Sequence, residues 1–445
     1  MHYTIKIGWA LLYFFLLCSP VSAHQQPTDS TAPRPMSLSQ VWAQAALNNK
    51  TLLLQQLQVQ RSDEEIKDAK AERLPDIGFE GEYARISNLP EFEDGLFHAP
   101  TQYEGVIHTS YKVGGEAYFN IYNGNKTNIK IATAQTEHNI ALEKQQLSES
   151  EVKLHAAAYY LDMQRSSEFR DLLLKDIATE EKQLDRIKNL QKSGVVLKSD
   201  VLRAALKLSK QKLALTQLNN DLAIANQKLN NIMGLDDSLR ITPTDTLRLD
   251  SLNGYDDYLE TAYENAYQIR ISGQETTLRK QQLKAVKANV APKIGLFANY
   301  TYAYPQIFLF PYADAAYAFG MAGVKASFNL SSLYHNKHKT GSAEIAYQQQ
   351  EVEHADTEDH VREAVRAAYL RYKESLERVT VSEANIIQAT ENARIVHNTY
   401  FAQTALITDL LDADTQLLQT RFDLAAARIA ARLQFYQLQN TIGKL

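Results

Sequence analysis

The sequence is poor in the two residues that interrupt helices. Glycine and proline contribute 17 and 11 of the 445 residues, about half of their usual share of roughly 12%. No proline occurs at 101–242 or after Pro311, and no glycine occurs at 125–193 or 342–442. Because glycine and proline end or weaken helices, these gaps predict very long helices and argue against a mixed α/β nucleotide-binding fold.

Other features that define function classes are also scarce. The chain has one cysteine, Cys18, which argues against a disulfide scaffold. The net charge is −5 and no Lys/Arg-rich tail is present, so we expect no nucleic-acid partner. The sequence has no phosphate-binding glycine loop and no nucleophile with an identifiable base. His335, His338, His354 and His360 are interpreted as solvated residues. We therefore expect no enzyme activity, no cofactor and no metal.

The first residues are typical of a secretory signal peptide. Lys6 precedes an apolar run at 7–17, and Val21-Ser22-Ala23 places small residues at a suitable cleavage site. We expect cleavage of residues 1–23, followed by a polar, proline-rich flexible leader at 24–36. The alternative is lipoprotein processing at Cys18, which the bulky Leu17 before it disfavours.

Two copies of one unit follow the leader. Segment 37–48 resembles 254–265, and later pairs such as Asp200 with Asp409 and Gly234 with Gly443 share one offset. The offset between matching residues changes within one segment, which is 84–118 in the first copy and 301–327 in the second. The two copies therefore differ in length there, which predicts an exposed loop of different length in each copy. The sequence therefore divides into a first repeat at 37–233, a crossing at 234–253 and a second repeat at 254–445.

Each repeat begins with a helical segment that ends at Pro75 or Pro292 and continues into two alternating segments. We predict strands at about 76–86 and 111–122 in the first repeat, and at about 293–304 and 317–330 in the second. One face is apolar and the other polar, which fits a membrane-barrel strand or a half-buried soluble sheet. Aromatic residues that crowd the second hairpin favour the membrane, as in interfacial belts: Tyr300, Tyr302, Tyr304, Phe308, Phe310, Tyr312, Tyr317 and Phe319.

The segment 125–192 contains neither proline nor glycine, and 336–402 contains no proline and one glycine, Gly341. Each segment predicts a helix about 100 Å long. Returning helices follow at 195–233 and 405–442. By length, we expect 195–233 to stack end to end with 254–291, and 37–74 with 405–442. The returning helices carry apolar residues seven apart, as in coiled coils: Val201, Leu208, Leu215, Leu222 and Leu229 with Ala204, Leu218, Ala225 and Ile232 in one, and Leu410, Leu417, Leu424, Ala431 and Leu438 in the other.

Four strands cannot close a barrel, and open sheet edges are not tolerated in hydrocarbon. Closure therefore requires several copies of the chain. Two copies give eight strands, whose interior side chains fill, whereas three give twelve, which leave room for a lumen. A pore formed by this chain is thus expected to be a homotrimer.

The ordered motifs resemble the TolC-like outer-membrane efflux protein family over nearly all of the mature length. Both repeats have an Asn near the end of the first helical segment (Asn48, Asn265), the proline-terminated helix and a Phe-Asn exit from the hairpin. The turn motifs GVVLKSDVL at 194–202 and LITDLLDA at 406–413 also fit. The resemblance implies a mainly α fold with membrane β structure. Three chains would form a 12-stranded barrel in the Gram-negative outer membrane, in contact with its lipid, that continues into a periplasmic α-helical tunnel.

The resemblance also implies an exit duct of a tripartite efflux system, docked to an inner-membrane pump through a periplasmic adaptor. Asp409 and Asp412 match acidic positions at the constricted entrance of family members, and Tyr400 matches a gate tyrosine. Asp200 and Ser199 occupy the equivalent turn of the first repeat. The alternative interpretation of Asp200 and Asp409 is that they stabilise helix N-termini.

The turns at the far end of the long helices are the expected adaptor-docking positions. They contain Gly194 and Val195 in the first repeat, and Gln403, Thr404 and Ala405 in the second. Well-known family members have an arginine at the position of Ala405, so charge pairing at that point is expected to be absent or rebuilt.

Two other functions remain open on the sequence. The same fold serves type I secretion of proteins, which differs only in the partner. A periplasmic coiled-coil scaffold without a pore is a third interpretation, and it predicts no outer-membrane localisation.

Overall fold

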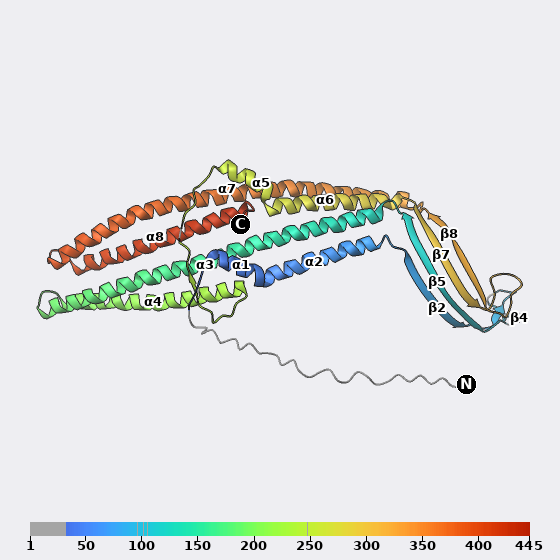
Figure 1. The fold of residues 1–445 in the computed structure, drawn as a ribbon, viewed down its shortest axis with the longest axis horizontal. Coiled ribbons are helices and arrows are strands. Elements are labelled where there is room, and N and C mark those ends of the chain that lie inside the picture. The colour runs from blue at the N-terminus through green and yellow to red at the C-terminus, as the bar shows by residue number, and fades with distance from the viewer. Residues whose placement is uncertain (1–32, 96, 101, 105, 247) are drawn as a thin grey trace, which may run out of the picture.

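The computed structural model describes residues 33–95, 97–100, 102–104, 106–246 and 248–445 of the chain. The expected signal peptide, Cys18 and most of the expected leader lie outside the described residues. The described chain is elongated, with long helices at one end and a small sheet at the other (Figure 1). No helix in the described ranges combines the length and apolar character needed to cross a membrane.

The first repeat contains four helices. α1 (Leu38–Asn48) and α2 (Lys50–Ala71) lead to the sheet, α3 (Lys126–Lys192) returns over its whole length, and α4 (Lys198–Met233) folds back along α3. Ser37 caps α1, where its hydroxyl accepts the Gln40 N–H and the Gln40 side chain accepts the Ser37 N–H. The predicted long helix of this repeat is confirmed.

The second repeat follows the same plan after a crossing segment. β6 (Ile241–Pro243) in the crossing pairs in parallel with β1 (Arg34–Met36). α5 (Tyr255–Asn265), α6 (Tyr267–Lys287) and the short 3-10 helix η1 (Ala288–Val290) lead to the sheet. α7 (Ser332–Phe401) spans 70 residues and α8 (Ile407–Thr441) returns along it.

The helical segments expected at 37–74 and 254–291 are each broken once. The backbone is extended at Asn49 and at Ala266, which separate α1 from α2 and α5 from α6. At the first break the Asn49 side-chain oxygen accepts the N–H groups of Thr51 and Leu52, at 2.9 and 3.3 Å. Asn49 therefore starts a new helix, which helical periodicity alone does not reveal.

The expected end-to-end stacking of helices is wrong. α4 ends against the α1–α2 break of its own repeat, where the Asn49 side chain donates to the Ile232 carbonyl at 2.9 Å. Gly234 there has a φ of +64°, and a Cβ on it would lie 2.8 Å from the Cβ of Asn48. Gly443 meets Asn265 in the same way at the end of α8. Each returning helix thus stacks with the first helices of its own repeat, because a glycine in a left-handed conformation lets the chain ends approach closely.

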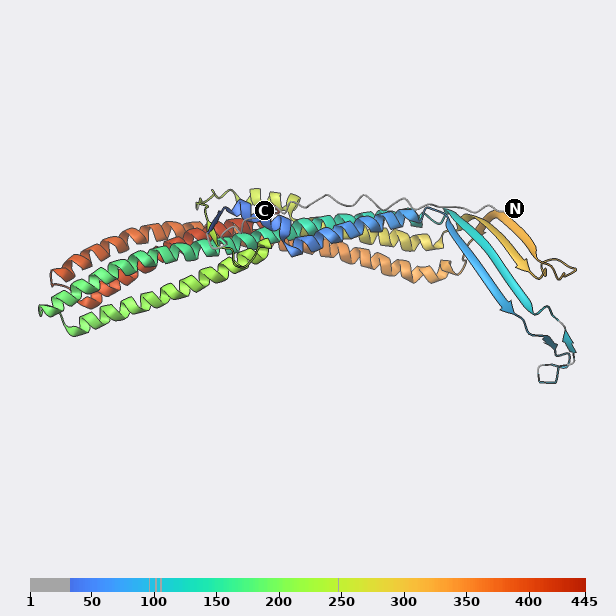
Figure 2. The same ribbon diagram turned by 60° about the horizontal axis from the view of Figure 1, so that its bottom comes forward.

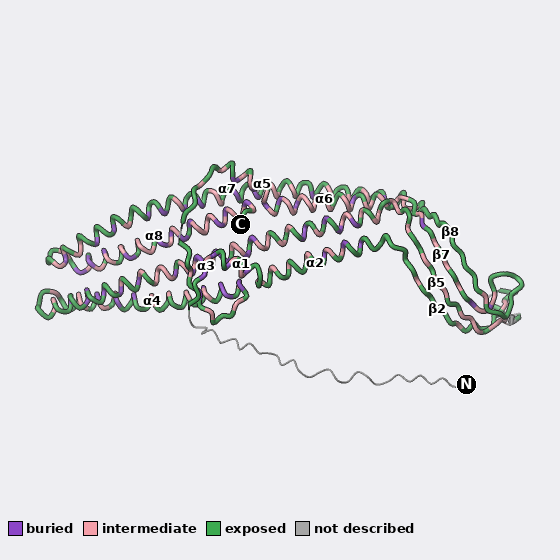
Figure 3. The backbone as a smooth tube through the Cα atoms, viewed as in Figure 1, coloured by how far each residue is buried: buried purple, intermediate pink, exposed green. Residues whose placement is uncertain are grey.

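The helices form a layer in which α3 and α7 are the long members. α3 packs against α2 and α4 on one side and against α6 and α8 on the other, and α7 packs against α6 and α8. α2 and α4 therefore lie at one edge of the layer and α7 at the opposite edge (Figure 1). Buried positions concentrate where helices face each other (Figure 3). The clusters there centre on residues such as Tyr160, Leu229, Leu410 and Tyr372.

The sheet has the antiparallel order β2–β5–β7–β8. Its strands are β2 (Asp76–Arg85), β5 (Thr109–Tyr122), β7 (Lys293–Tyr304) and β8 (Tyr317–Ser327). The four predicted strands are confirmed to within a few residues. Figure 2 shows that the sheet bends away from the direction of the helices.

Each repeat contains the loop that was predicted to differ in length from its counterpart, and this loop lies at the outer end of the sheet. In the first repeat it carries a small hairpin, β3 (Leu89–Glu91) with β4 (Gln102–Glu104). In the second repeat the connection is only 305–316. The aromatic residues assigned together to an interfacial belt are divided by the register. Tyr300 and Tyr302 share a face with Phe79 and Val113, whereas Phe319 lies on the opposite face, so a single belt is wrong.

Candidate functional site

Two turns form the end of the molecule farthest from the sheet (Figure 1). We call the connections 193–197 and 402–406 the distal turns. Gly194 and Gln403 have φ angles of +72° and +65°. In both turns the backbone closes in the same way: the Gly194 N–H donates to Gln191, and the Gln403 N–H donates to Tyr400, at 3.0 and 2.9 Å. The two repeats therefore present equivalent turns side by side.

The predicted docking residues all lie in these turns. Gly194, Val195, Gln403 and Thr404 are exposed, whereas Ala405 is partly buried against the helix ends. Each turn also exposes a leucine immediately before its returning helix. Leu197 and Leu406 occupy equivalent positions and are 71% and 69% exposed. Exposed leucines at matching positions indicate an apolar contact surface.

Asp200 and Asp409 cap the returning helices. The Leu197 N–H donates to the Asp200 carboxylate at 3.2 Å, and the Leu406 N–H donates to the Asp409 carboxylate at 3.1 Å. The interpretation of these residues as helix-terminal carboxylates is therefore confirmed. Ser199 is exposed beside Asp200 and donates to its carboxylate at 3.4 Å.

Asp412 and Tyr400 have very different environments. Asp412 is exposed one turn after Asp409 and lines a groove between α4 and α8. Tyr400 is 6% exposed, and its hydroxyl is buried without a hydrogen-bond partner among the described residues. Burial raises the pKa of Tyr400, and the charge of Asp200 nearby raises it further. The structure thus brings Tyr400 and Asp200 together, whereas the Asp412 side chain is exposed on α8.

A group of buried charges connects three helices a few turns from the distal turns, and the sequence analysis missed it. The Lys207 ammonium on α4 lies 2.6 Å from Glu180 on α3 and 3.7 Å from Asp414 on α8. It also donates to the Leu411 carbonyl at 3.3 Å. We call Glu180, Lys207 and Asp414 the Lys207 cluster.

Neutral amides extend the Lys207 cluster. Gln183 donates to Asp414 at 3.0 Å, and Gln211 donates to Asp176 at 2.6 Å. Burial raises the pKa of Glu180, partly offset by its bond to Lys207. Burial also raises the pKa of Asp176. The cluster holds more carboxylates than ammonium groups in a place where charge is costly.

Apolar stripes occupy the outer faces of both edge helices. On α4 the exposed residues Leu202, Leu206, Leu213 and Ile224 fall on one line, opposite the face that packs on α3. α7 carries an equivalent line opposite its own buried face. We call these lines the edge stripes, and the second consists of Ile345, Val352, Leu370, Val381 and Ile395. Heptad-like apolar lines of this kind are typical of helix–helix contacts.

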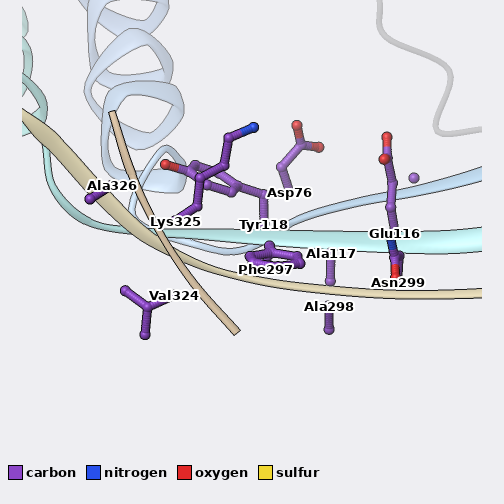
Figure 4. Close-up of a pocket in the computed structure, with 11 residues that line it drawn as sticks. Asp76, Glu116, Ala117, Tyr118, Phe297, Ala298, Asn299, Val324, Lys325 and Ala326 are labelled. Atoms are coloured by element: carbon purple, nitrogen blue, oxygen red, sulfur yellow. The ribbon is translucent and has the colours of Figure 1, made fainter. Parts of the chain in front are cut away.

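The two faces of the sheet differ in polarity near its junction with the helices. A hollow of about 770 Å³ on one face is lined by Asp76, Glu116, Asn299 and Lys325, among others. In Figure 4 these polar side chains project to one side of the strands, whereas Val324 and Ala298 project to the other. The polar side is hereafter called the polar face and the other the apolar face.

Each repeat also contains a partly buried Ser–His pair between its sheet-directed helix and its long helix. Ser62 and Ser272 donate to backbone carbonyls, and their oxygens lie 2.9 and 2.7 Å from Nδ1 of His138 and His354. Nδ1 therefore carries the proton in both rings. His354, interpreted as a solvated residue, instead ties α6 to α7.

Residues 41–235 match the family described as outer membrane efflux protein. A comparison with curated proteins found no match. Among solved structures, the chain is similar to VceC from Vibrio cholerae, with 16% identity, coverage of 91% of this chain and 96% of that chain, and a TM-score of 0.75. It is also similar to CusC, with 16% identity, coverage of 95% of each chain and a TM-score of 0.76. The Campylobacter jejuni CmeC outer membrane channel gives 13% identity, coverage of 92% and 85%, and a TM-score of 0.72. At these identities the likeness shows the fold.

Proposed function

We propose that the chain is the outer-membrane channel of a tripartite efflux system, because residues 41–235 match the outer membrane efflux protein family. Three copies form a 12-stranded β-barrel in the outer membrane and a helical tunnel in the periplasm. The channel conducts substrates passively, and a periplasmic adaptor connects it to an inner-membrane pump.

The observation that carries this proposal is the four-stranded sheet with its two free edges. Among the described residues, β2 pairs only with β5, and β8 only with β7. The sheet has an apolar face with highly exposed residues such as Ile77 and Phe79. A sheet that is apolar outside, polar inside and open at both edges satisfies its backbone in a membrane only by pairing β8 of one copy with β2 of the next.

The edge stripes support the same closure among the helices. In a ring of three copies, α7 of one copy faces α4 and α2 of the next, and the part of the α7 stripe nearer the distal turns covers the α4 stripe. The stripes lie on the helices that have no neighbour on that side within one described chain. Burying two such lines of aliphatic side chains stabilises the ring by about 25 cal/mol for each Å² of apolar surface removed from water. A scaffold without a pore leaves both the stripes and the apolar face of the sheet uncovered.

The distal turns then form the periplasmic mouth. Leu197 and Leu406, with Gly194, Val195, Gln403 and Thr404 around them, supply the adaptor-docking surface. Three-fold repetition places the carboxylates of Asp200, Asp409 and Asp412 around one axis, where they attract cations. Tyr400 and Ser199 lie next to Asp200 and belong to the same gate.

Photocrosslinking in cells tests the proposal directly. A photoreactive residue replaces Gln403 in the distal turn, and a control variant carries it at Phe97, which is 99% exposed at the outer end of the sheet. We expect the Gln403 variant to capture a periplasmic adaptor and the Phe97 variant to capture none. Outer-membrane fractionation and native mass spectrometry of the purified channel establish its location and the presence of three copies.

The outcomes separate the parts of the proposal. Recovery of the chain in the periplasmic soluble fraction, or as a monomer in detergent, would contradict a trimeric outer-membrane channel. Capture of an adaptor by the Phe97 variant, but not by the Gln403 variant, would reverse the proposed orientation.

A further inference from the structure

The connection between β7 and β8 exposes an apolar tip at the end of the molecule opposite the distal turns (Figure 1). We call residues 307–312 the apolar tip. Phe310 is 88% exposed there, and its neighbours are also largely exposed: Ile307, Phe308, Leu309 and Tyr312. The connection contains one charged residue, Asp314, whose carboxylate accepts the Tyr304 hydroxyl. A concentration of exposed apolar side chains without free charge indicates a surface that another apolar surface covers.

The apolar tip is an ordered part of the hairpin. Gln306 and Ala313 exchange both backbone hydrogen bonds at 3.0 Å, and the Gln306 side chain donates to the Leu309 carbonyl at 3.0 Å. The other hairpin ends differently, in a segment that carries Glu91, Glu93 and Asp94. The first hairpin also exposes Phe97, but in a segment that carries these acidic residues. An apolar tip with a single charged residue is therefore specific to the second hairpin.

The direction of the apolar tip follows from one ring contact. The Phe308 ring packs against Phe319 and Tyr317, with ring centroids 4.7 and 6.4 Å apart. The register aligns Phe319 with Thr301, Gly114 and Glu80 across the four strands. Paired residues share a face, so Phe308 lies against the polar face of the sheet. The tip therefore leans toward the side that faces the lumen of the proposed channel, and away from lipid.

We infer that the apolar tips of three copies meet over the outer end of the lumen and pack against one another as an apolar constriction. This inference rests on the proposed trimeric channel. The partner that covers each tip is the same segment of the other two copies. Near a three-fold axis, each Phe310 faces its own equivalents. A ring of aromatic and aliphatic side chains without charge opposes the passage of water and ions while the tips are together. Apolar substrates separate the tips at a smaller cost than ions do, because they replace one apolar contact by another.

A disulfide between identical positions tests the arrangement, because identical residues of a trimer approach one another only near its axis. In a Cys18→Ala background, the Phe310→Cys channel is purified and oxidised. We expect a disulfide-linked dimer on a non-reducing gel, with the third subunit left free. Tyr83→Cys is the matched control: it is an aromatic residue 73% exposed on the apolar face of β2, and it stays monomeric on the gel.

Native mass spectrometry of the same samples distinguishes the two possible failures. A trimer in which Phe310→Cys forms no more dimer than Tyr83→Cys overturns the inference and leaves the proposed channel intact. Absence of a trimer contradicts the proposed function itself.

Single-channel conductance gives a second readout that needs no crosslink. Phe310→Ser retains the Phe308 contact that orders the tip, and we expect it to raise the conductance of the channel in a planar bilayer. Tyr83→Ser should leave the conductance unchanged. Equal conductance of the Phe310→Ser and wild-type channels overturns the constriction.

Discussion

Glu180 occupies a core position of α3, in the series of positions seven apart that includes Leu173 and Ile187. It is 4% exposed, and Lys207 from α4 supplies its ammonium partner. A buried ion pair of this kind adds little net stability relative to apolar packing, but it penalises any arrangement that separates the partners. The Lys207 cluster therefore specifies how α3, α4 and α8 fit together near the distal turns.

We predict that Lys207→Ala lowers the free energy of unfolding by about 3–5 kcal/mol, because it leaves Glu180 charged and buried without a partner. Lys212→Ala is the matched control. Lys212 pairs with Glu181 one position further along α3, but both side chains are about half exposed, so the loss should be about 0–1 kcal/mol. Helical circular dichroism during heating of the detergent-solubilised channel measures both. Equal losses in the two variants would contradict the special status of the Lys207 cluster.

Stability should also depend on pH through the same residues. Burial raises the pKa of Glu180 above its ordinary value of 4.5, so the folded state binds its proton more tightly than the unfolded chain does. The free energy of unfolding therefore rises as the pH falls from the raised pKa toward 4.5. We predict that Glu180→Gln weakens this pH dependence. The exposed neighbour Glu181 provides the control substitution, Glu181→Gln, which should leave it unchanged. If the free energy of unfolding of the Glu180→Gln channel had the same pH dependence as that of the wild type, the prediction would be contradicted.

One feature of the sequence indicated buried polar contacts at the Lys207 cluster, although a search for apolar periodicity does not detect it. The seam of α4 at Ala204, Leu218 and Ala225 includes Gln211 at the intervening position. A polar residue at a core position of a coiled coil predicts a buried polar contact. Its partner could not be derived, because Asp176 lies on another helix, and the contact depends on how the two helices are aligned.

The strands were predictable because several local rules agree on them. Proline ends the preceding helix, and side chains alternate between the two faces over about ten residues. The end of β2 at Arg85 and the start of β7 at Lys293 deviate little from expectation. The faces at the start of β8 were not predictable in the same way, since Tyr317 and Phe319 are aromatic residues on the polar face.

The stacking of the helices could not be derived from length alone. All four shorter helical segments have similar lengths, so either pairing fills the space beside a long helix. Close contacts at the breaks decide between them. Asn48 and Gly234 recur as Asn265 and Gly443 in the second repeat. These repeated pairs were visible in the sequence as separate motifs, but their contact depends on tertiary structure.

We predict that Gly234→Ala destabilises the junction between α4 and α1. Alanine at a φ of +64° costs about 1–2 kcal/mol, and the crowded Cβ beside Asn48 adds about 1–3 kcal/mol of overpacking. Gly341→Ala is the control: Gly341 lies within α7 with open space around it, so alanine should stabilise the helix by about 0.5–1 kcal/mol. Thermal unfolding of the two variants should shift in opposite directions. A Gly234→Ala channel as stable as wild type would show that the junction can relax.

The assembly of the whole molecule depends on surfaces that a single chain leaves uncovered. Alternation in the strands indicated a membrane face, but heptads indicated only the inner seams of the helices. The edge stripes were not identified from the sequence, because leucines such as Leu206 and Leu213 lie among many apolar residues of α4. Their exposure identifies them: they remain at the surface after α4 has packed on α3.

We predict that Leu206→Asp and Leu213→Asp each prevent formation of the trimer without unfolding the chain. Both leucines are about 60% exposed in one chain, so a carboxylate there costs the monomer little. At the interface between α4 and the neighbouring α7, the same carboxylate would be buried without a partner, at a cost of several kcal/mol. Asn219→Asp adds the same group to α4 at an exposed position away from the stripe and should assemble normally. Native mass spectrometry of the purified variants in detergent measures the populations. If Leu213→Asp remained as fully trimeric as Asn219→Asp, the stripe of α4 would have to face the lumen or the periplasm, and the ring would have to close through other surfaces.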